Sequence, residues 1–98
     1  MSKFLVIWSL DVGSIGPQAI NAVLKMPAYA QELFGKKKLE KRYHIVGSHG
    51  GAWIYDVNSN EELDILLAQA PVYNMARYTV YPLAEMQSPT ITMQEPDN

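Results

Sequence analysis

The chain has 98 residues, which is enough for one small domain with a single hydrophobic core. Its 48% hydrophobic residues, 18% charged residues and formal net charge of −2 are typical of a folded globular protein, without the positive charge that nucleic-acid binding requires. It contains no cysteine, which excludes disulfides, thiolate metal sites and a cysteine nucleophile. These totals favour a cytoplasmic protein with no nucleic-acid partner.

Residues 3–10 show the alternating pattern of a β-strand. The residues expected on one face are Phe4, Val6, Trp8 and Leu10. Leu5 and Ile7 make the opposite face apolar as well. The run is far too short to span a membrane and lacks the basic region and cleavage site of a secretory signal. We therefore predict a buried strand and no membrane association.

The apolar residues that follow recur at helical spacing between positions 17 and 35. Pro17 suits the first turn of a helix, where its missing N–H is not needed. Pro27 should kink this helix or split it in two, and Gly35 is expected at its C-terminus. The predicted apolar stripe consists of Ala19, Ile20, Val23, Leu24, Tyr29, Ala30, Leu33 and Phe34.

Residues 42–57 read as two strands joined by a glycine-rich connection, and they contain both histidines of the chain. Histidine is the side chain best suited to exchanging protons near neutral pH, so this is where proton chemistry is expected. His44 and His49 are five positions apart and would face opposite ways on a regular strand. A joint role would need a bulge near Gly47.

Ser59 and Glu62 have the spacing of a capping box, which predicts the start of a second helix. Residues 77–83 read as the last strand, so the order of elements is β-α-β-β-α-β. This order predicts a ferredoxin-like α+β fold, with a four-stranded antiparallel sheet and the helices on one face. We expect residues 1–86 to form this domain and residues 87–98 an extended tail that could pack on a neighbouring subunit.

The face of the predicted sheet opposite the helices is also apolar. At roughly 25 cal/mol per Å² of apolar surface, leaving it in water would forgo several kcal/mol of stabilisation. The simplest cover is a second copy of the chain, sheet against sheet across a two-fold axis. We therefore predict a homodimer, and a larger homo-oligomer built from such dimers remains open.

Several short motifs resemble those of the muconolactone isomerases. Tyr-His-Ile-Val-Gly at 43–47 resembles that family's Trp-Arg-Ile-Ala-Gly, and Tyr-Asp-Val at 55–57 aligns with its Phe-Asp-Val. Pro-Val-Tyr-Asn-Met at 71–75 is similar to its Pro-Leu-Phe-Pro-Tyr connector. The resemblance extends over roughly 30–91. It implies a dimeric α+β barrel that works without metal or organic cofactor and moves a proton between carbons of an unsaturated lactone.

The chain departs from the family pattern at three positions that bear on the site. The family's arginine after the aromatic residue is His44 here, and histidine lacks the fixed fork with which arginine binds a carboxylate. The family's histidine position is Ser48, with His49 one residue later, and its asparagine position is Gly51. The resemblance therefore leaves the substrate open.

From the residues and the resemblance together we predict that His49 and His44 transfer protons. The predicted substrate contacts are Ser48, Tyr55, Trp8, Trp53, Tyr73 and Tyr81. No metal site is expected, because two histidines occur without a suitably spaced pair of carboxylates.

The leading function is a cofactor-independent isomerase that shifts a proton on a small hydrophobic lactone or related unsaturated ring. Two alternatives stay open. One is a cofactor-free oxygenase or cyclase that acts on an aromatic or polyketide-like substrate bound by tryptophan and tyrosine rings. The other is a non-catalytic ligand-binding or assembly module, because the family's arginine, histidine and asparagine are all replaced.

Overall fold

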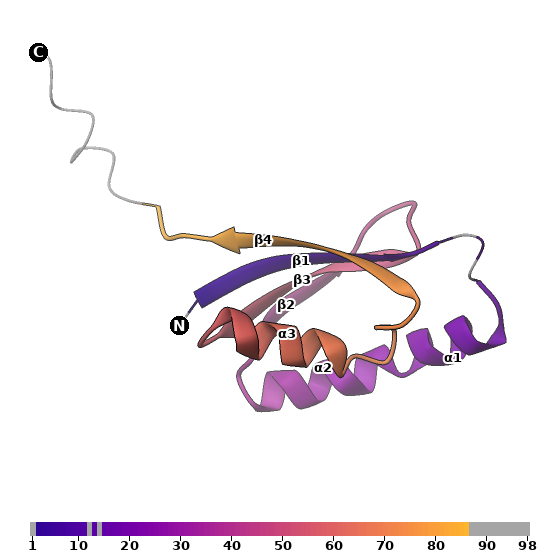
Figure 1. The fold of residues 1–98 in the computed structure, drawn as a ribbon, viewed down its shortest axis with the longest axis horizontal. Helices are drawn as coiled ribbons and strands as arrows, with labels where there is room; N and C mark the ends of the chain where they lie inside the picture. Colours follow the sequence, from indigo (N-terminus) through magenta and orange to yellow (C-terminus); the bar gives the residue numbers. More distant parts are fainter. Residues whose placement is uncertain (1, 12, 14, 87–98) are drawn as a thin grey trace, which may run out of the picture.

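The computed structural model describes residues 2–11, 13 and 15–86. Seven elements follow one another along the chain (Figure 1). They are β1 (Ser2–Leu10), α1 (Pro17–Leu24), α2 (Met26–Gly35), β2 (Leu39–His44), β3 (Gly50–Val57), α3 (Asn60–Ala68) and β4 (Ala76–Leu83). The predicted tail, residues 87–98, lies outside the described residues.

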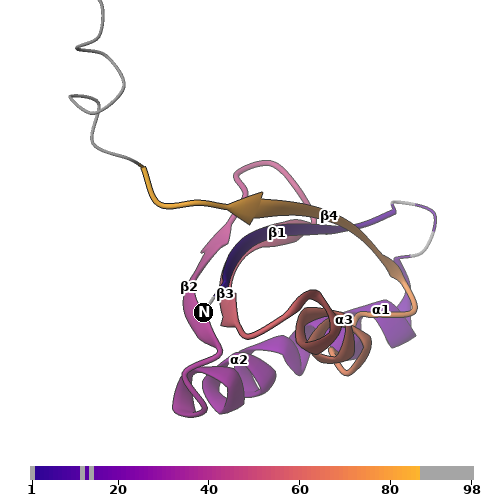
Figure 2. The same ribbon diagram turned by 60° about the vertical axis from the view of Figure 1, so that its left-hand side comes forward.

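The four strands form one antiparallel sheet in the order β2-β3-β1-β4. The sheet is curved and arches over the helices, which all lie on one side of it (Figure 2). This arrangement confirms the predicted ferredoxin-like α+β fold. β4 is an edge strand, which explains how Pro82 is tolerated there without a backbone N–H.

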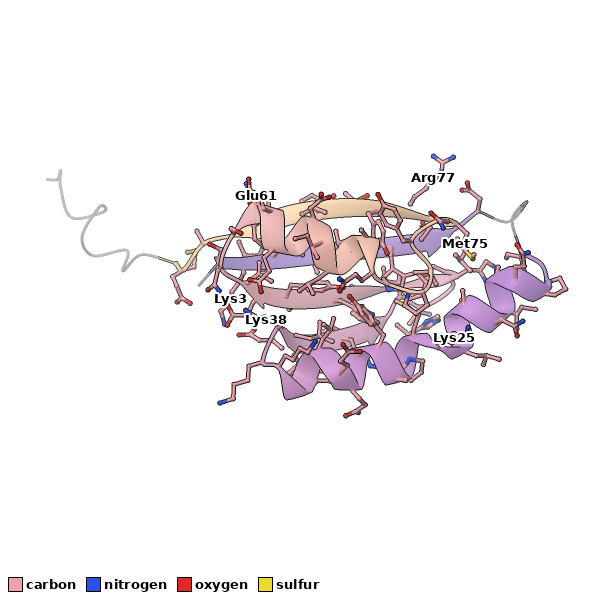
Figure 3. All side chains as sticks on the ribbon, turned by 60° about the horizontal axis from the view of Figure 1, so that its bottom comes forward. Lys3, Lys25, Lys38, Glu61, Met75 and Arg77 are labelled. Carbon is pink, nitrogen blue, oxygen red and sulfur yellow. The ribbon has the colours of Figure 1, made fainter. Side chains whose placement is uncertain are left out.

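The first helical region is two helices, α1 and α2, separated at Lys25 (Figure 3). The proline ring at position 27 would clash with a continuous helix and cannot donate to the carbonyl of Val23, so the predicted split is confirmed. Gly35 is the last residue of α2, so the helix ends where the sequence predicts. The cap is the next residue, Lys36, and the left-handed conformation is taken by Lys37, with φ of 60°.

The hydrophobic core lies between the sheet and the helices. Strand pairing places Phe4 opposite Tyr55 and Val6 opposite Trp53, and all four of these side chains are buried on the helix-facing side. Leu33 of α2 packs against them at 1% exposure. The residues of β3 alternate between buried and partly exposed, so the single chain covers only one face of this strand.

The start of α3 confirms one half of the predicted capping box. The amide of Glu62 donates to the hydroxyl oxygen of Ser59 over 3.1 Å. The Glu62 carboxylate, however, accepts from the amide of Asn58 over 2.7 Å and also pairs with Lys38 over 2.8 Å. The hydrogen bond from Asn58, followed by the contact with Lys38, lowers the pKa of Glu62.

The opposite face of the sheet carries a row of apolar side chains that the chain leaves accessible. Ile54, Leu5 and Tyr81 are paired across β3, β1 and β4, and Tyr81 is 48% exposed. No helix in the described part of the chain is long and apolar enough to cross a membrane.

Candidate active site

A cavity of about 640 Å³ opens between the sheet and the first two helices. Its walls come from the end of β1, from α1 and the first turn of α2, from the end of β2, and from the turn leading into β3. It lies at one end of the sheet face whose other end is the packed core. The molecule therefore builds core and cavity on the same surface.

The floor of the cavity is set by strand register. Gly51 is paired with Trp8 on one side and with His44 on the other, and residues paired directly across antiparallel strands share a face. In the next row Trp53 is paired with Arg42. Gly51 has no side chain, so the space above it stays open and is bordered by the neighbouring side chains on the same face.

The two histidines reach this cavity from opposite sides of a tight turn. His44 ends β2, and the chain reverses before Gly50 begins β3, so His49 lines the cavity as well. Gly47 makes this reversal possible, because its φ of 82° is rarely accessible to other residues. A reversal of the chain, rather than a bulge within one strand, brings both histidines together.

Ser48 also lines the cavity, but its hydroxyl is partly engaged in holding the turn. The hydroxyl donates to the carbonyl of Ile45 over 2.9 Å, and the Ser48 amide donates to the same oxygen over 3.1 Å. Next along the chain, the carbonyl of His49 accepts from the amide of Leu10 over 3.0 Å. These bonds tie the turn to β1 and fix the position of the histidine backbone.

Arg42 is a cavity residue that sequence reasoning missed. It lies on the same strand face as His44, two residues earlier, and this spacing of two was the available signal. Its guanidinium carbon is 5.9 Å from the ring centre of Trp53. The lining residues include no Asp or Glu, and none of the ion pairs among the described residues involves Arg42.

The two tryptophans predicted to bind substrate both line the cavity, with their ring nitrogens near Gly51. A Cβ atom at position 51 would lie 3.2 Å from Nε1 of Trp8 and 3.3 Å from Nε1 of Trp53. Nε1 of Trp8 is buried, and within the described part of the chain it has no hydrogen-bond partner. A free donor is therefore available beside the open space.

The wall opposite the sheet is apolar. Ile20 and Leu24 were predicted as members of a core stripe, but they are 51% and 71% exposed and line the cavity instead. The core positions of α1 are taken by the smaller Ala19 and Ala22. The larger side chains of this helix border the cavity.

Three of the predicted substrate contacts lie away from this cavity. Tyr55 is 2% exposed in the packed core, where burial raises the pKa of its hydroxyl and Trp53 stacks on it with ring centres 6.2 Å apart. Tyr73 stacks on Tyr78 beyond α3, and Tyr81 lies on the opposite face of the sheet. The cavity gives no support to a binding role for these three tyrosines.

No cluster of three His, Asp or Glu side chains suited to a metal ion occurs in residues 2–11, 13 and 15–86. The functional groups present are two imidazoles, a guanidinium, a hydroxyl and indole N–H donors in an apolar setting. Such a set can bind an anionic, flat organic molecule and move a proton on it.

Comparison with known proteins agrees with this description. The family model for muconolactone delta-isomerase matches residues 4–88. A muconolactone delta-isomerase of Cupriavidus pinatubonensis (strain JMP 134 / LMG 1197) is 35% identical over 71 residues, covering 72% of this chain and 77% of that protein.

Two solved structures share the fold at low sequence identity. A muconolactone isomerase crystal structure superposes with a TM-score of 0.75 at 22% identity, covering 98% of this chain and 99% of the other. A 5-chloro-2-hydroxyhydroquinone dehydrochlorinase from Burkholderia phenoliruptrix AC1100, in complex with 2,5-dihydroxybenzoquinone, gives 0.70 at 18% identity, covering 86% and 95%. The fold thus carries more than one reaction. From the match over residues 4–88 and the Cupriavidus relative, the chain belongs to the muconolactone delta-isomerase family.

Proposed function

We propose that this protein is a cofactor-independent isomerase that moves a proton between two carbons of a small unsaturated lactone bearing a carboxylate. The observation that carries the proposal is that His44, His49 and Arg42 all face one apolar cavity in a member of this family. Imidazoles supply the proton transfer, and a permanent cation supplies the anchor for an anionic substrate.

The reaction needs a base, a temporary acceptor of charge and an acid. A neutral imidazole takes a proton from the sp³ carbon at the far end of the conjugated C=C–C=O system, and the electrons of that C–H bond delocalise through the C=C bond onto the carbonyl oxygen. The resulting imidazolium, or the second imidazole in its protonated form, gives a proton to the carbon next to the lactone carbonyl. One proton leaves and one is added, so no oxidant or cofactor is required. Either His44 or His49 takes the first proton in this mechanism.

Arg42 gives the cavity its fixed charge. Its guanidinium is stacked near Trp53, which limits the orientations available to it, and its fork can bind a carboxylate through two parallel hydrogen bonds. The apolar wall formed by Ile20 and Leu24 would hold the ring against the sheet. This division of tasks places the charged end of the substrate toward β2 and its ring over Gly51.

The test is a turnover assay with muconolactone on the purified protein, following substrate and product by chromatography. We expect turnover by the wild type and its loss on double substitution of His44 and His49 with Ala. Tyr73→Phe, which lies outside the cavity, is the matched control and should keep wild-type activity. Intact turnover in the double variant would reject the two histidines as the proton-transfer groups, and absence of turnover in the wild type would reject the named reaction.

We also propose that the enzyme is a homodimer in the cytoplasm, with the apolar sheet face covered by a second copy. Ile54, Leu5 and Tyr81 form an apolar row across three strands, and no described residue of the same chain covers it. Exposing this apolar surface to water would cost free energy. Light scattering at micromolar concentration should give at least twice the mass of the 11.0 kDa chain. A stable monomer would contradict this assembly.

A second candidate is a cofactor-free oxygenase acting on a phenol. The observation in its favour is the aromatic lining formed by the indole rings of Trp8 and Trp53. Consumption of oxygen with a candidate phenol, measured with an oxygen electrode, separates it from isomerisation, which uses no oxygen.

A further inference from the structure

The starting observation is a buried donor without an acceptor. Trp8 is 8% exposed, and its Nε1 is shielded from solvent without a hydrogen-bond partner among the described residues. Leaving a buried N–H unpaired costs about 1–3 kcal/mol, and native proteins rarely tolerate this without a functional reason. A second indole N–H, that of Trp53, lies beside the same space.

The space itself exists because position 51 is glycine. Measured from the point that a Cβ would occupy there, the nearest atoms of the two indoles are their nitrogens, at 3.2 Å and 3.3 Å. The carbonyl oxygen of Tyr43 is 2.7 Å from the same point, so an oxygen bound here must sit further out into the cavity than a Cβ would. The proposed place for the oxygen is therefore on the cavity side of the Cβ position, next to the two indole nitrogens.

The proton-transfer groups flank this place. His44 is paired directly across from Gly51, and Trp8 is paired with Gly51 from the other side. A carbonyl oxygen held between the indoles would therefore lie one strand away from the imidazole of His44. Proton transfer on a ring conjugated with that carbonyl requires a base and an oxyanion donor around the same small molecule.

We propose that the indole N–H groups of Trp8 and Trp53 form an oxyanion site, donating hydrogen bonds to the carbonyl oxygen that becomes negatively charged when the proton is removed. The proposal rests on the proposed isomerase function and assigns the stabilisation of its intermediate. When the proton leaves the far carbon, the C–H electrons form a new C=C bond, the electrons of the original C=C bond shift toward the carbonyl carbon, and the carbonyl π electrons move to oxygen. Protonation at the carbon next to the carbonyl restores the C=O bond, so the oxygen is neutral again in the product.

The site also gives a reason for the departure from the family pattern at position 51. Where the family motif has asparagine, any side chain here would fill the place that the oxygen needs. Donors fixed in advance and shielded from water stabilise a developing charge far better than mobile or solvated ones. Two indoles held within the packed face of the sheet meet that condition.

The first test uses 4-nitrophenolate, a flat oxyanion that binds without reacting, at a pH where the phenol is ionised. The chain has two tryptophans, so a ¹⁵N-labelled sample shows just two indole N–H resonances. Both should move downfield on binding, and the neutral 4-nitroanisole should bind about tenfold more weakly. Unmoved indole resonances, or equal affinity for the two ligands, would overturn the proposal.

The second test removes the donor while keeping the ring. Replacing Trp8 by 3-(3-benzothienyl)alanine exchanges the N–H for sulfur, so the core packing is preserved and thermal unfolding should be unchanged. We expect about tenfold weaker 4-nitrophenolate binding and about a hundredfold lower kcat on the lactone with little change in KM. The standard variant Trp8→Phe provides a second removal of the donor.

The outcomes separate this proposal from the function on which it rests. Specific 4-nitrophenolate binding that depends on the Trp8 N–H, without turnover of muconolactone, would support the oxyanion site and reject the named reaction. Turnover that survives the sulfur replacement unchanged would reject the oxyanion site and leave the isomerase function standing.

Discussion

The helix-facing side of the sheet is packed core at one end and an open cavity at the other, although the strand sequences at the two ends are similar. At one end Tyr55 and Val57 are closed over by α2 and α3, and the surface is solid core. At the other end Gly51 and His44 face a cavity that α1 borders with its larger side chains, and position 51 has no side chain to fill it. Core and site thus differ in whether side chains fill the space above one continuous sheet surface. Substitutions at the two ends should therefore have different effects on stability and activity.

The largest difference is expected between two leucines of the helical region. Leu33→Ala at the packed end should lower the free energy of unfolding by about 2–5 kcal/mol, because Leu33 is 1% exposed and its removal leaves a void. Leu24→Ala at the cavity end should change it by about 0.5 kcal/mol or less, since Leu24 is 71% exposed. Urea unfolding measures both. Similar losses would mean that the cavity end is as tightly packed as the core.

Gly51→Ala is expected to damage the cavity end specifically. The new methyl group would lie 2.7 Å from the carbonyl oxygen of Tyr43 and beside both indole nitrogens, which forces a shift of β2 or β3. We expect a loss of about 1–3 kcal/mol in stability and at least a hundredfold loss of turnover. Gly35→Ala, with open space around the added atom, is the control and should leave turnover unchanged. An active Gly51→Ala variant would show that the space above this residue is not used.

Arg42→Gln should affect binding more than chemistry. Loss of the guanidinium removes the proposed anchor for the substrate carboxylate, so we expect KM to rise about tenfold or more with a smaller change in kcat. Steady-state kinetics give the comparison, and Lys41→Gln on the opposite face of the same strand is the control. A fall in kcat with KM unchanged would instead place Arg42 at the reacting atoms.

Lys37→Gly should stabilise the packed end slightly. Lys37 has φ of 60° after α2, a conformation that costs an ordinary residue about 1–2 kcal/mol and glycine much less. Part of that gain is offset by the greater freedom of glycine in the unfolded chain, so the expected increase is about 0.5–1 kcal/mol. Thermal unfolding compares it with Lys36→Gly, which should destabilise.

The smallest expected effect is an acid dependence at the start of α3. The folded pKa of Glu62 is lowered below its ordinary value of 4.5, so its contribution to stability is present above that value and is lost as the pH falls through the folded value. Stability measured from pH 6 downward should therefore decline less steeply in Glu62→Gln than in the wild type. Glu61→Gln, an exposed neighbour, should follow the wild type, and identical slopes in all three proteins would rule out this contribution.

Much of the fold could be read from local patterns. The alternation in residues 3–10, the proline at position 27 and the pairing of Ser59 with Glu62 each act over a few residues, and each predicted element is present. α2 ends at Gly35 as predicted, but glycine is only a preference after a helix, and the left-handed conformation there is taken by Lys37.

The site was predicted less completely, and the reasons lie in long-range geometry. Proton chemistry in residues 42–57 followed from histidine alone, but the tyrosines at 55, 73 and 81 were chosen for their chemistry without knowing which face each would occupy. Arg42 was not among the predicted contacts, because only the pairing of β2 with β3 places it beside Trp53. Strand register, set by pairing with β3 and β1, decides which of these side chains meet.

The sequence by itself determined the order of strands and helices, the split at Pro27 and the family, because these depend on spacing and short motifs that act locally. Only the tertiary structure decided that His44 and His49 share one cavity, that Arg42 joins them, and that two indole nitrogens meet above Gly51. The physical reason is that an empty space is a property of packing. It depends on how side chains from distant parts of the sequence pack around it, and on the absence of a side chain at Gly51.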